Sequence, residues 1–182
     1  MNKEKGLFII GTRPEIIKTY PLINKLNSEI LFTGQHFDKQ MSKYFYNLVG
    51  NNKIYEINED YKNSNHNTVT NNIKKAIDSI NPAYVVVQGD TNSTLFGAIA
   101  AKYSKKKLFY IESGLRSKDL GQVEEYNRFI VSKLADINFC NHKSNIENLL
   151  NEGINKKNIY LSGSTVYTSL NSMLDKGNFK KK

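Results

Sequence analysis

The feature that most constrains this chain is the regular alternation of short apolar runs with longer stretches of helical periodicity. The apolar runs predict strands buried on both faces, at 6–10, 30–33, 54–57, 84–87, 108–111, 137–140 and 159–161. Apolar residues at three- and four-residue spacing predict helices at 14–26, 39–49, 68–80, 95–103, 125–134, 144–151 and 166–174. Strand–helix–strand units join parallel strands by right-handed crossovers. The order therefore predicts a three-layer, Rossmann-like α/β domain with a mostly parallel sheet.

The predicted domain covers residues 1–175, and its edges follow from composition. The segment 58–67 is polar, has no apolar period and is expected to be a loop. The lysine-rich tail at 176–182 is expected to be disordered. No apolar run approaches the roughly 18–20 residues that a spanning helix needs, so we expect no membrane insertion.

Charge and cysteine content narrow the function classes. The 182 residues include 26 Lys and Arg against 17 Asp and Glu, a formal net charge of +9. The lysines are scattered and no recognition motif is present, which disfavours a nucleic-acid partner. A basic surface also attracts small anionic ligands such as sugar nucleotides. The single cysteine, Cys140, excludes an internal disulfide framework and fits a reducing, cytoplasmic location.

The candidate site lies where the predicted strands end, because ligands of open parallel sheets bind at the carboxyl ends of the strands. The first strand is followed by GTRPEIIK at 11–18, which lacks the glycine fingerprint of nicotinamide and flavin sites. No cofactor is therefore expected. Arg13 and Lys18 stand at a helix start, where phosphate is favoured. The alternative is an ordinary loop with two surface cations.

Acidic residues follow three later elements, and each has a plainer alternative. Asp90 follows the central strand and could instead cap the next helix. Glu112 follows the next strand and could pair with Arg116. Glu124 could be an ordinary acid at a helix start. Carboxyl groups beside a phosphate-ready loop suit proton transfer on an anionic substrate.

Histidines offer little further chemistry. His36 could line the cleft, whereas His66 and His142 lie in polar surroundings and are expected to be solvated. No spacing of histidine, cysteine and acidic residues predicts a metal site.

Together these loops resemble the non-hydrolysing UDP-N-acetylglucosamine 2-epimerases. The matching blocks are GTRPEIIK at 11–18, TGQH at 33–36, QGDTNST at 88–94, ESGLRS at 112–117, EEYNR at 124–128 and SGST at 162–165. The resemblance implies the N-terminal domain of a two-domain, glycosyltransferase-B-type fold. It also implies interconversion of UDP-N-acetylglucosamine and UDP-N-acetylmannosamine without a redox cofactor, by anti elimination of UDP and its re-addition.

The resemblance also implies roles for particular residues. It places Asp90, Glu112 and Glu124 among the catalytic carboxylates. It places Arg13, Lys18 and His36, together with Asp90 and Glu112, in contact with the substrate. The family usually has a proline before the acidic pair, where this chain has Val123.

Family enzymes are roughly twice as long, so the sequence is expected to represent an N-terminal half. We expect the chain alone to have no measurable epimerase activity. A separate C-terminal half, or a second copy of the chain, is the expected partner. Two alternatives remain open. One is a non-catalytic subunit that binds a sugar nucleotide or another protein, and the other is half of a related glycosyltransferase.

Overall fold

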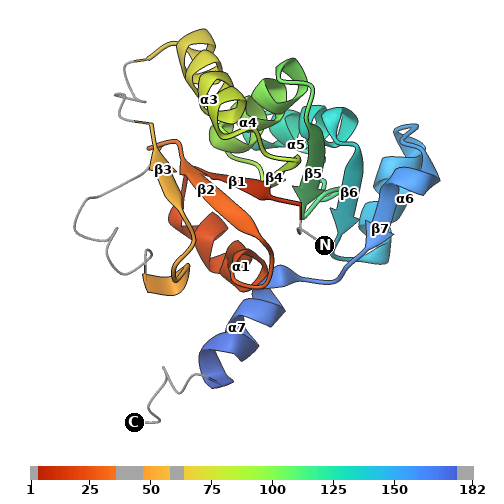
Figure 1. Ribbon diagram of the computed structural model, residues 1–182. Coiled ribbons are helices and arrows are strands. Elements are labelled where there is room, and N and C mark those ends of the chain that lie inside the picture. Colours follow the sequence, from red (N-terminus) through yellow and green to blue (C-terminus); the bar gives the residue numbers. More distant parts are fainter. Residues whose placement is uncertain (1–3, 36–46, 58–63, 176–182) are drawn as a thin grey trace.

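The computed structural model describes residues 4–35, 47–57 and 64–175 (Figure 1). The strands are β1 (Gly6–Ile10), β2 (Ser28–Phe32), β3 (Ile54–Glu56), β4 (Tyr84–Gln88), β5 (Lys107–Ile111), β6 (Ile137–Cys140) and β7 (Ile159–Leu161). They form one sheet in the order β3-β2-β1-β4-β5-β6-β7, and every neighbouring pair is parallel. The predicted Rossmann-like α/β fold class is thereby confirmed.

The helices are α1 (Arg13–Ile23), α3 (His66–Ile80), α4 (Asn92–Tyr103), α5 (Val123–Leu134), α6 (Lys143–Asn151) and α7 (Thr165–Asp175), with a 3₁₀ turn η1 (Lys156–Asn158). Helices α3 and α4 begin before their predicted starts at 68 and 95, and in both a side chain caps the first turn. The Asn65 side chain accepts a hydrogen bond from the Thr68 amide at 2.8 Å, so α3 begins inside the expected loop. None of the described helices is long and apolar enough to cross a membrane.

Some sequence predictions fall outside the described residues. Most of the helix expected at 39–49 and the whole tail at 176–182 belong to this group. The proposed domain boundary at 175 therefore stays a prediction.

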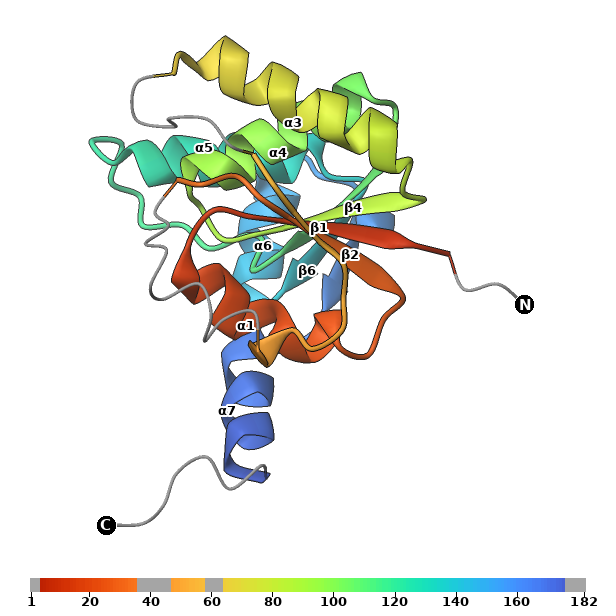
Figure 2. The ribbon, with the colours of Figure 1, turned by 60° about the vertical axis from the view of Figure 1, so that its left-hand side comes forward.

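The chain direction decides which face of the sheet each helix covers. From β1 the chain runs one way to β2 and β3, and after α3 it runs the other way from β4 to β7. Right-handed crossovers must then place α1 on one face and α3, α4 and α5 on the opposite face. Figure 2 shows this arrangement, with α3, α4 and α5 above the sheet and α1 below it.

The two faces are packed to different degrees. On the face under α3, α4 and α5, the core includes Leu7, Val85, Val87 and Leu108. On the other face, α1 covers β1 and β2, and α7 packs against α1, with the Tyr20 hydroxyl donating to the Ser169 carbonyl at 3.1 Å. Among the described helices, no crossover helix reaches the part of that face formed by β4, β5 and β6.

This part of the sheet is an apolar groove of about 410 Å³. Aromatic rings from adjacent strands form its floor: Tyr84 stacks on Phe109 with centroids 4.9 Å apart, and Phe109 meets Phe139 edge to face at 6.2 Å. Leu22 and Leu26 form one wall, and 162–165 forms another. We call this surface the aromatic groove.

Candidate functional site

The loops at the carboxyl ends of β1 and β4 enclose an open hollow of about 810 Å³. Its walls are Thr12, Arg13, Pro14, Glu15, Ile17, Lys18, Gln88, Gly89, Asp90 and Thr91. Arg13 is half-buried and lies in the first turn of α1. The structure thus brings both predicted cations and Asp90 to one hollow, as expected from the topology of the sheet.

Glu112 follows β5 and reaches the hollow by pairing with Lys18, a residue of α1 that lines it. Its carboxylate accepts a hydrogen bond from the Lys18 ammonium at 2.7 Å and a second from the Gln88 amide. The backbone of Glu112 is left-handed, with φ of +68°. A glutamate tolerates this conformation only where its surroundings hold it, and such strain concentrates at functional sites.

The alternative prediction, that Glu112 pairs with Arg116, was wrong. Arg116 instead binds Glu152 through two nitrogens, at 2.7 and 2.8 Å, and donates to the Ser132 hydroxyl at 2.9 Å. A guanidinium prefers this paired geometry. Arg116 therefore fastens the loop after β5 to α5 and to the end of α6, which leaves Glu112 facing Lys18.

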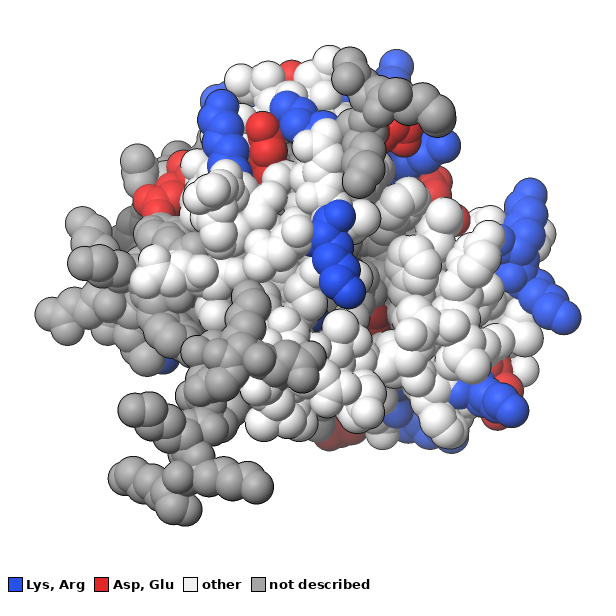
Figure 3. Space-filling view, turned by 60° about the horizontal axis from the view of Figure 1, so that its bottom comes forward, with Lys and Arg blue, Asp and Glu red and all other residues white. Residues whose placement is uncertain are grey.

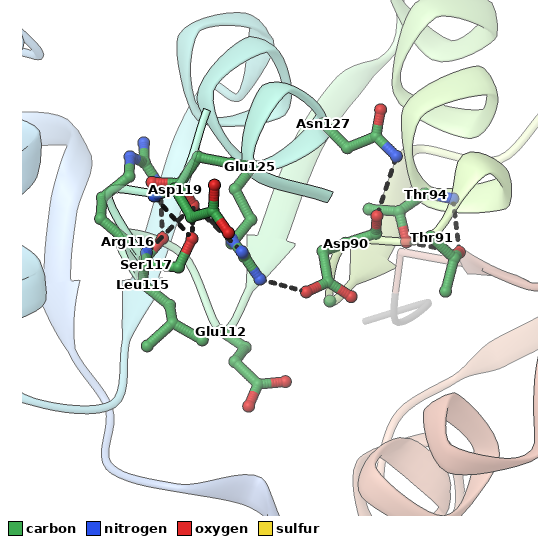
Figure 4. Close-up of polar contacts among 12 residues, drawn as sticks. Asp90, Thr91, Thr94, Glu112, Leu115, Arg116, Ser117, Asp119, Glu125 and Asn127 are labelled. Atoms are coloured by element: carbon green, nitrogen blue, oxygen red, sulfur yellow. Dashed lines mark hydrogen bonds and ion pairs between the residues drawn. The ribbon is translucent and has the colours of Figure 1, made fainter. Parts of the chain in front are cut away.

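Asp90 does not cap α4, so that alternative was also wrong. Thr91 is the cap, and its hydroxyl accepts from the Thr94 amide at 3.2 Å. The Asp90 carboxylate instead binds the guanidinium of Arg128, and the Asn127 side chain donates to the Asp90 carbonyl at 2.9 Å (Figure 4). Helix α5 therefore holds both the side chain and the backbone of Asp90.

The two acidic residues in the first turn of α5, Glu124 and Glu125, differ in their exposure to solvent. Glu124 is exposed, whereas Glu125 is buried. The Glu125 carboxylate accepts from the amides of Ser117 at 3.1 Å and Lys118 at 3.0 Å, and from Arg128 at 3.0 Å. Burial by itself would raise the pKa of Glu125, but these donors outweigh it and lower the pKa below its usual value.

Glu125 and Arg128 belong to the block at 124–128 that the sequence singled out, but neither was predicted as a site residue. Their spacing of three residues on a helix was the available signal, since side chains at this spacing share a face. The catalytic role of Glu124 stays a prediction.

The two histidines that the structure describes do not line the hollow. His36 lies outside the described residues. His66 is exposed, but its ring lies 4.9 Å from that of Phe96. His142 is exposed and caps α6 by accepting from the Ser144 amide at 3.2 Å.

On the face of the molecule that Figure 3 shows, charged side chains are dispersed. In Figure 3 the lysine and arginine side chains of the described residues are separated by uncharged surface and by acidic side chains, without a continuous basic stripe. This distribution differs from the basic stripe of nucleic-acid-binding surfaces. Among the described residues, no three histidine, cysteine or acidic side chains are grouped as metal ligands would be.

Comparison with known proteins gives consistent matches. A family model described as UDP-N-acetylglucosamine 2-epimerase matches residues 22–182. The UDP-N-acetylglucosamine 2-epimerase of Methanococcus maripaludis is 36% identical, over 87% of this chain and 45% of the relative. The UDP-2,3-diacetamido-2,3-dideoxy-D-glucuronate 2-epimerase of Pseudomonas aeruginosa is 38% identical, over 84% of this chain and 46% of the relative.

A solved structure matches equally well. The UDP-GlcNAc 2-epimerase of Methanocaldococcus jannaschii, in complex with UDP-GlcNAc and UDP, superposes with a TM-score of 0.83 and 32% identity. The match covers 97% of this chain and 51% of that one. The chain therefore spans about half the length of the relatives it matches.

Proposed function

Because the chain belongs to the UDP-N-acetylglucosamine 2-epimerase family, we propose that it supplies acid–base and phosphate-binding groups for epimerising a UDP-linked acetamido sugar at carbon 2. The observation that carries the proposal is the ion pair between Lys18 and Glu112, 2.7 Å long, beside Asp90 at the edge of one hollow. It joins a cation suited to phosphate with a carboxylate suited to proton transfer.

The reaction needs two proton-transfer groups. A carboxylate removes the proton from sugar C2, and the electron pair of that C–H bond forms the C1–C2 double bond. UDP leaves with the electron pair of the C1–O bond. A second group then protonates C2 on the other face while a UDP oxygen attacks C1. Atoms and electrons balance without a redox cofactor, and we assign these roles to Asp90 and Glu112, with Glu124 as a third acidic group.

The cations act on the leaving group in this proposal. Arg13 and Lys18 would neutralise charge that grows on the diphosphate as the C1–O bond breaks, which is the usual way such transition states are stabilised. Lys18 would be shared between phosphate and Glu112, so binding of UDP would also hold that carboxylate in place. His36 is proposed as a further substrate contact on the strength of the resemblance alone.

We also propose a partner of domain size. The relatives are about twice as long as this chain, and the aromatic groove exposes rings that a soluble domain normally covers. We propose that a separate second half forms the other wall of a cleft at the hollow. The alternative is that a second copy of the chain forms it. A cytoplasmic location is proposed because a single, buried cysteine suits a reducing compartment.

Proton exchange at C2 tests the proposed activity directly. The chain is incubated in deuterated water with UDP-N-acetylglucosamine, alone and with the part of the Methanococcus maripaludis relative that it does not match. We expect deuterium at C2 only when both parts are present, because a cleft needs two walls. The diacetamido glucuronate nucleotide is tested in parallel, since a relative of that name is equally similar.

Two outcomes would change the proposal. Exchange catalysed by the chain alone would show that no second half is needed. Binding of the sugar nucleotide without exchange, even with the second half present, would favour a non-catalytic binding subunit.

A further inference from the structure

A buried glutamate that the proposed reaction does not use forms part of the wall of the hollow. Glu15 is in the first turn of α1, between Arg13 and Lys18, and only 3% of its surface is exposed. One carboxyl oxygen, Oε2, accepts hydrogen bonds from the amides of Gly11 at 2.6 Å and Thr12 at 3.0 Å. These contacts are the familiar arrangement of a capping box, and they stay within the α1 start.

The other oxygen of Glu15 leaves its own helix. Oε1 accepts from the Thr91 hydroxyl at 2.6 Å and from the Thr94 hydroxyl at 3.4 Å. Thr91 follows Asp90 directly and caps α4. A helix cap alone would require only Oε2, so the second set of bonds connects two loops that are 76 residues apart in sequence.

A second link reinforces the position of the α4 start. The Gln35 side chain accepts from the amide and the hydroxyl of Ser93, at 2.9 and 2.7 Å. The Ser93 hydroxyl also lies 2.6 Å from that of Thr33. The first turn of α4 is thereby fastened to the segment that follows β2. Glu15 joins the start of α4 to the loop with the cations.

We propose that Glu15 is a positioning residue, whose side chain fixes the spacing between the phosphate-facing cations Arg13 and Lys18 and the acid Asp90. The inference rests on the proposed function for the roles of those three residues. The link itself rests on geometry. A buried carboxyl that lost one of its donors would pay for an unsatisfied oxygen, so the two loops cannot separate without a cost.

Thr91 offers a cleaner test than Glu15, because it is only partly buried and its replacement leaves the capping box intact. Thr91→Val removes the hydroxyl and keeps the shape, and Thr91→Ser keeps the hydroxyl. Thr91→Val also removes the cap of α4, so the matched control is Asn65→Ala, which removes the cap of α3 and should leave the amides of Gly11 and Thr12 unaffected. A second control is Thr70→Val on α3, where the lost hydroxyl bonds to the His66 carbonyl at 2.8 Å. Amide hydrogen exchange is measured by NMR on the full chain without ligand.

The expected signal appears across the gap, at the amides of Gly11 and Thr12. We expect Thr91→Val to speed their exchange about tenfold, because the carboxyl that holds them loses its anchor. Thr91→Ser should restore the wild-type rates, and Thr70→Val should leave them unchanged. Equal rates at Gly11 and Thr12 in Thr91→Val and Thr70→Val would overturn the proposal, and so would a failure of Thr91→Ser to restore them.

A kinetic measurement then tests whether the Glu15–Thr91 link affects catalysis, separately from whether the proposed reaction occurs at all. With a second half supplied, we expect Thr91→Val to lower kcat for C2 exchange about tenfold and Thr91→Ser to restore it, because the spacing between the cations and Asp90 is fixed only while the hydroxyl is present. If the wild type exchanges no deuterium, the proposed function fails, yet the amide rates still decide whether Glu15 couples the loops. A variant with faster amide exchange and an unchanged kcat would leave a link without a positioning role and overturn the proposal.

Discussion

The polar hollow and the aromatic groove lie on the same domain and differ in how complete they are. Around the hollow, acidic side chains already have partners within the chain: Glu112 with Lys18, Asp90 with Arg128, and Glu15 with Thr91. In the groove, by contrast, the rings of Tyr84, Phe109 and Phe139 contact one another but remain partly open to solvent.

The difference concerns how each surface is formed: the chain supplies the polar contacts of the hollow, whereas the rings of the groove are left for a proposed partner to cover. Hydrogen bonds and ion pairs are directional, so a polar site has to be built before a ligand arrives if it is to act without reorganising. An apolar surface needs no such construction and simply remains uncovered until an apolar partner packs on it. The chain itself therefore builds the hollow, whereas we propose that a partner covers the groove.

The largest expected effect comes from removing the acids of the hollow. With a second half supplied, we expect Asp90→Asn and Glu112→Gln each to lower the rate of C2 proton exchange by about 10²–10⁴-fold, the usual contribution of a general acid or base. Thermal midpoints measured alongside should fall only slightly, because both side chains are partly exposed.

Glu147→Gln is the control for this experiment, since Glu147 is an exposed acid on α6. It should change neither rate nor midpoint. If Asp90→Asn melts earlier but exchanges at the wild-type rate, Asp90 only anchors Arg128. If Glu112→Gln is also silent, the chain provides shape rather than chemistry.

Two phenylalanines on the same sheet face test whether the groove is truly open. Phe32 lies under α1 with 2% of its surface exposed, whereas Phe109 lies in the groove. We expect Phe32→Ala to lower the free energy of unfolding by about 3–5 kcal/mol, as in a closed core. Phe109→Ala should cost about 1–2 kcal/mol, because a half-covered ring has less apolar area to lose.

Urea unfolding of the isolated chain provides both values. Adding the second half should then raise the cost of Phe109→Ala toward that of Phe32→Ala if that half covers the groove. Equal costs for the two variants in the isolated chain would contradict the description of the groove as open.

The sequence predicted the fold well because the fold depends on local patterns. Apolar runs such as 84–87 can only be strands of a covered sheet, and a parallel sheet with right-handed crossovers then places the ends of β1, β4 and β5 together. Several boundaries shifted, and at the helix starts His66 and Asn92 a single capping side chain decides the boundary.

The site was predicted only in outline, for a physical reason. Reasoning from one sequence pairs residues that are close along the chain, so Arg116 was the natural partner for Glu112. The actual partner, Lys18, is 94 residues away. Glu15 carried a readable signal, since Thr12 and Glu15 have the spacing of a capping box, but its bond to Thr91 depends on how two loops meet in space.

The smallest expected effect is the pH dependence of stability that two buried glutamates cause, Glu15 in α1 and Glu125 in α5. The apolar groove should show no such dependence. Burial raises the pKa of Glu15 above its ordinary value of 4.5, although Thr91, Gly11 and Thr12 donate to it. The stability due to Glu15 is therefore fully present below about pH 4.5 and is lost as pH rises through the folded-state pKa.

Glu125 behaves in the opposite way. Its burial is outweighed by hydrogen bonds from Ser117, Lys118 and Arg128, which lower the pKa of Glu125. Its contribution is present above about pH 4.5 and is lost as pH falls through the folded-state pKa.

Urea unfolding across a pH series should therefore give opposite slopes for two variants that cannot titrate. Relative to Glu15→Gln, the wild type should lose stability as pH rises above about 4.5. Relative to Glu125→Gln, it should lose stability as pH falls below about 4.5. Phe109→Ala removes no titratable group, so its difference from the wild type should not depend on pH. Slopes of the same sign for the two glutamates would mean that the loops around the hollow do not hold them as described.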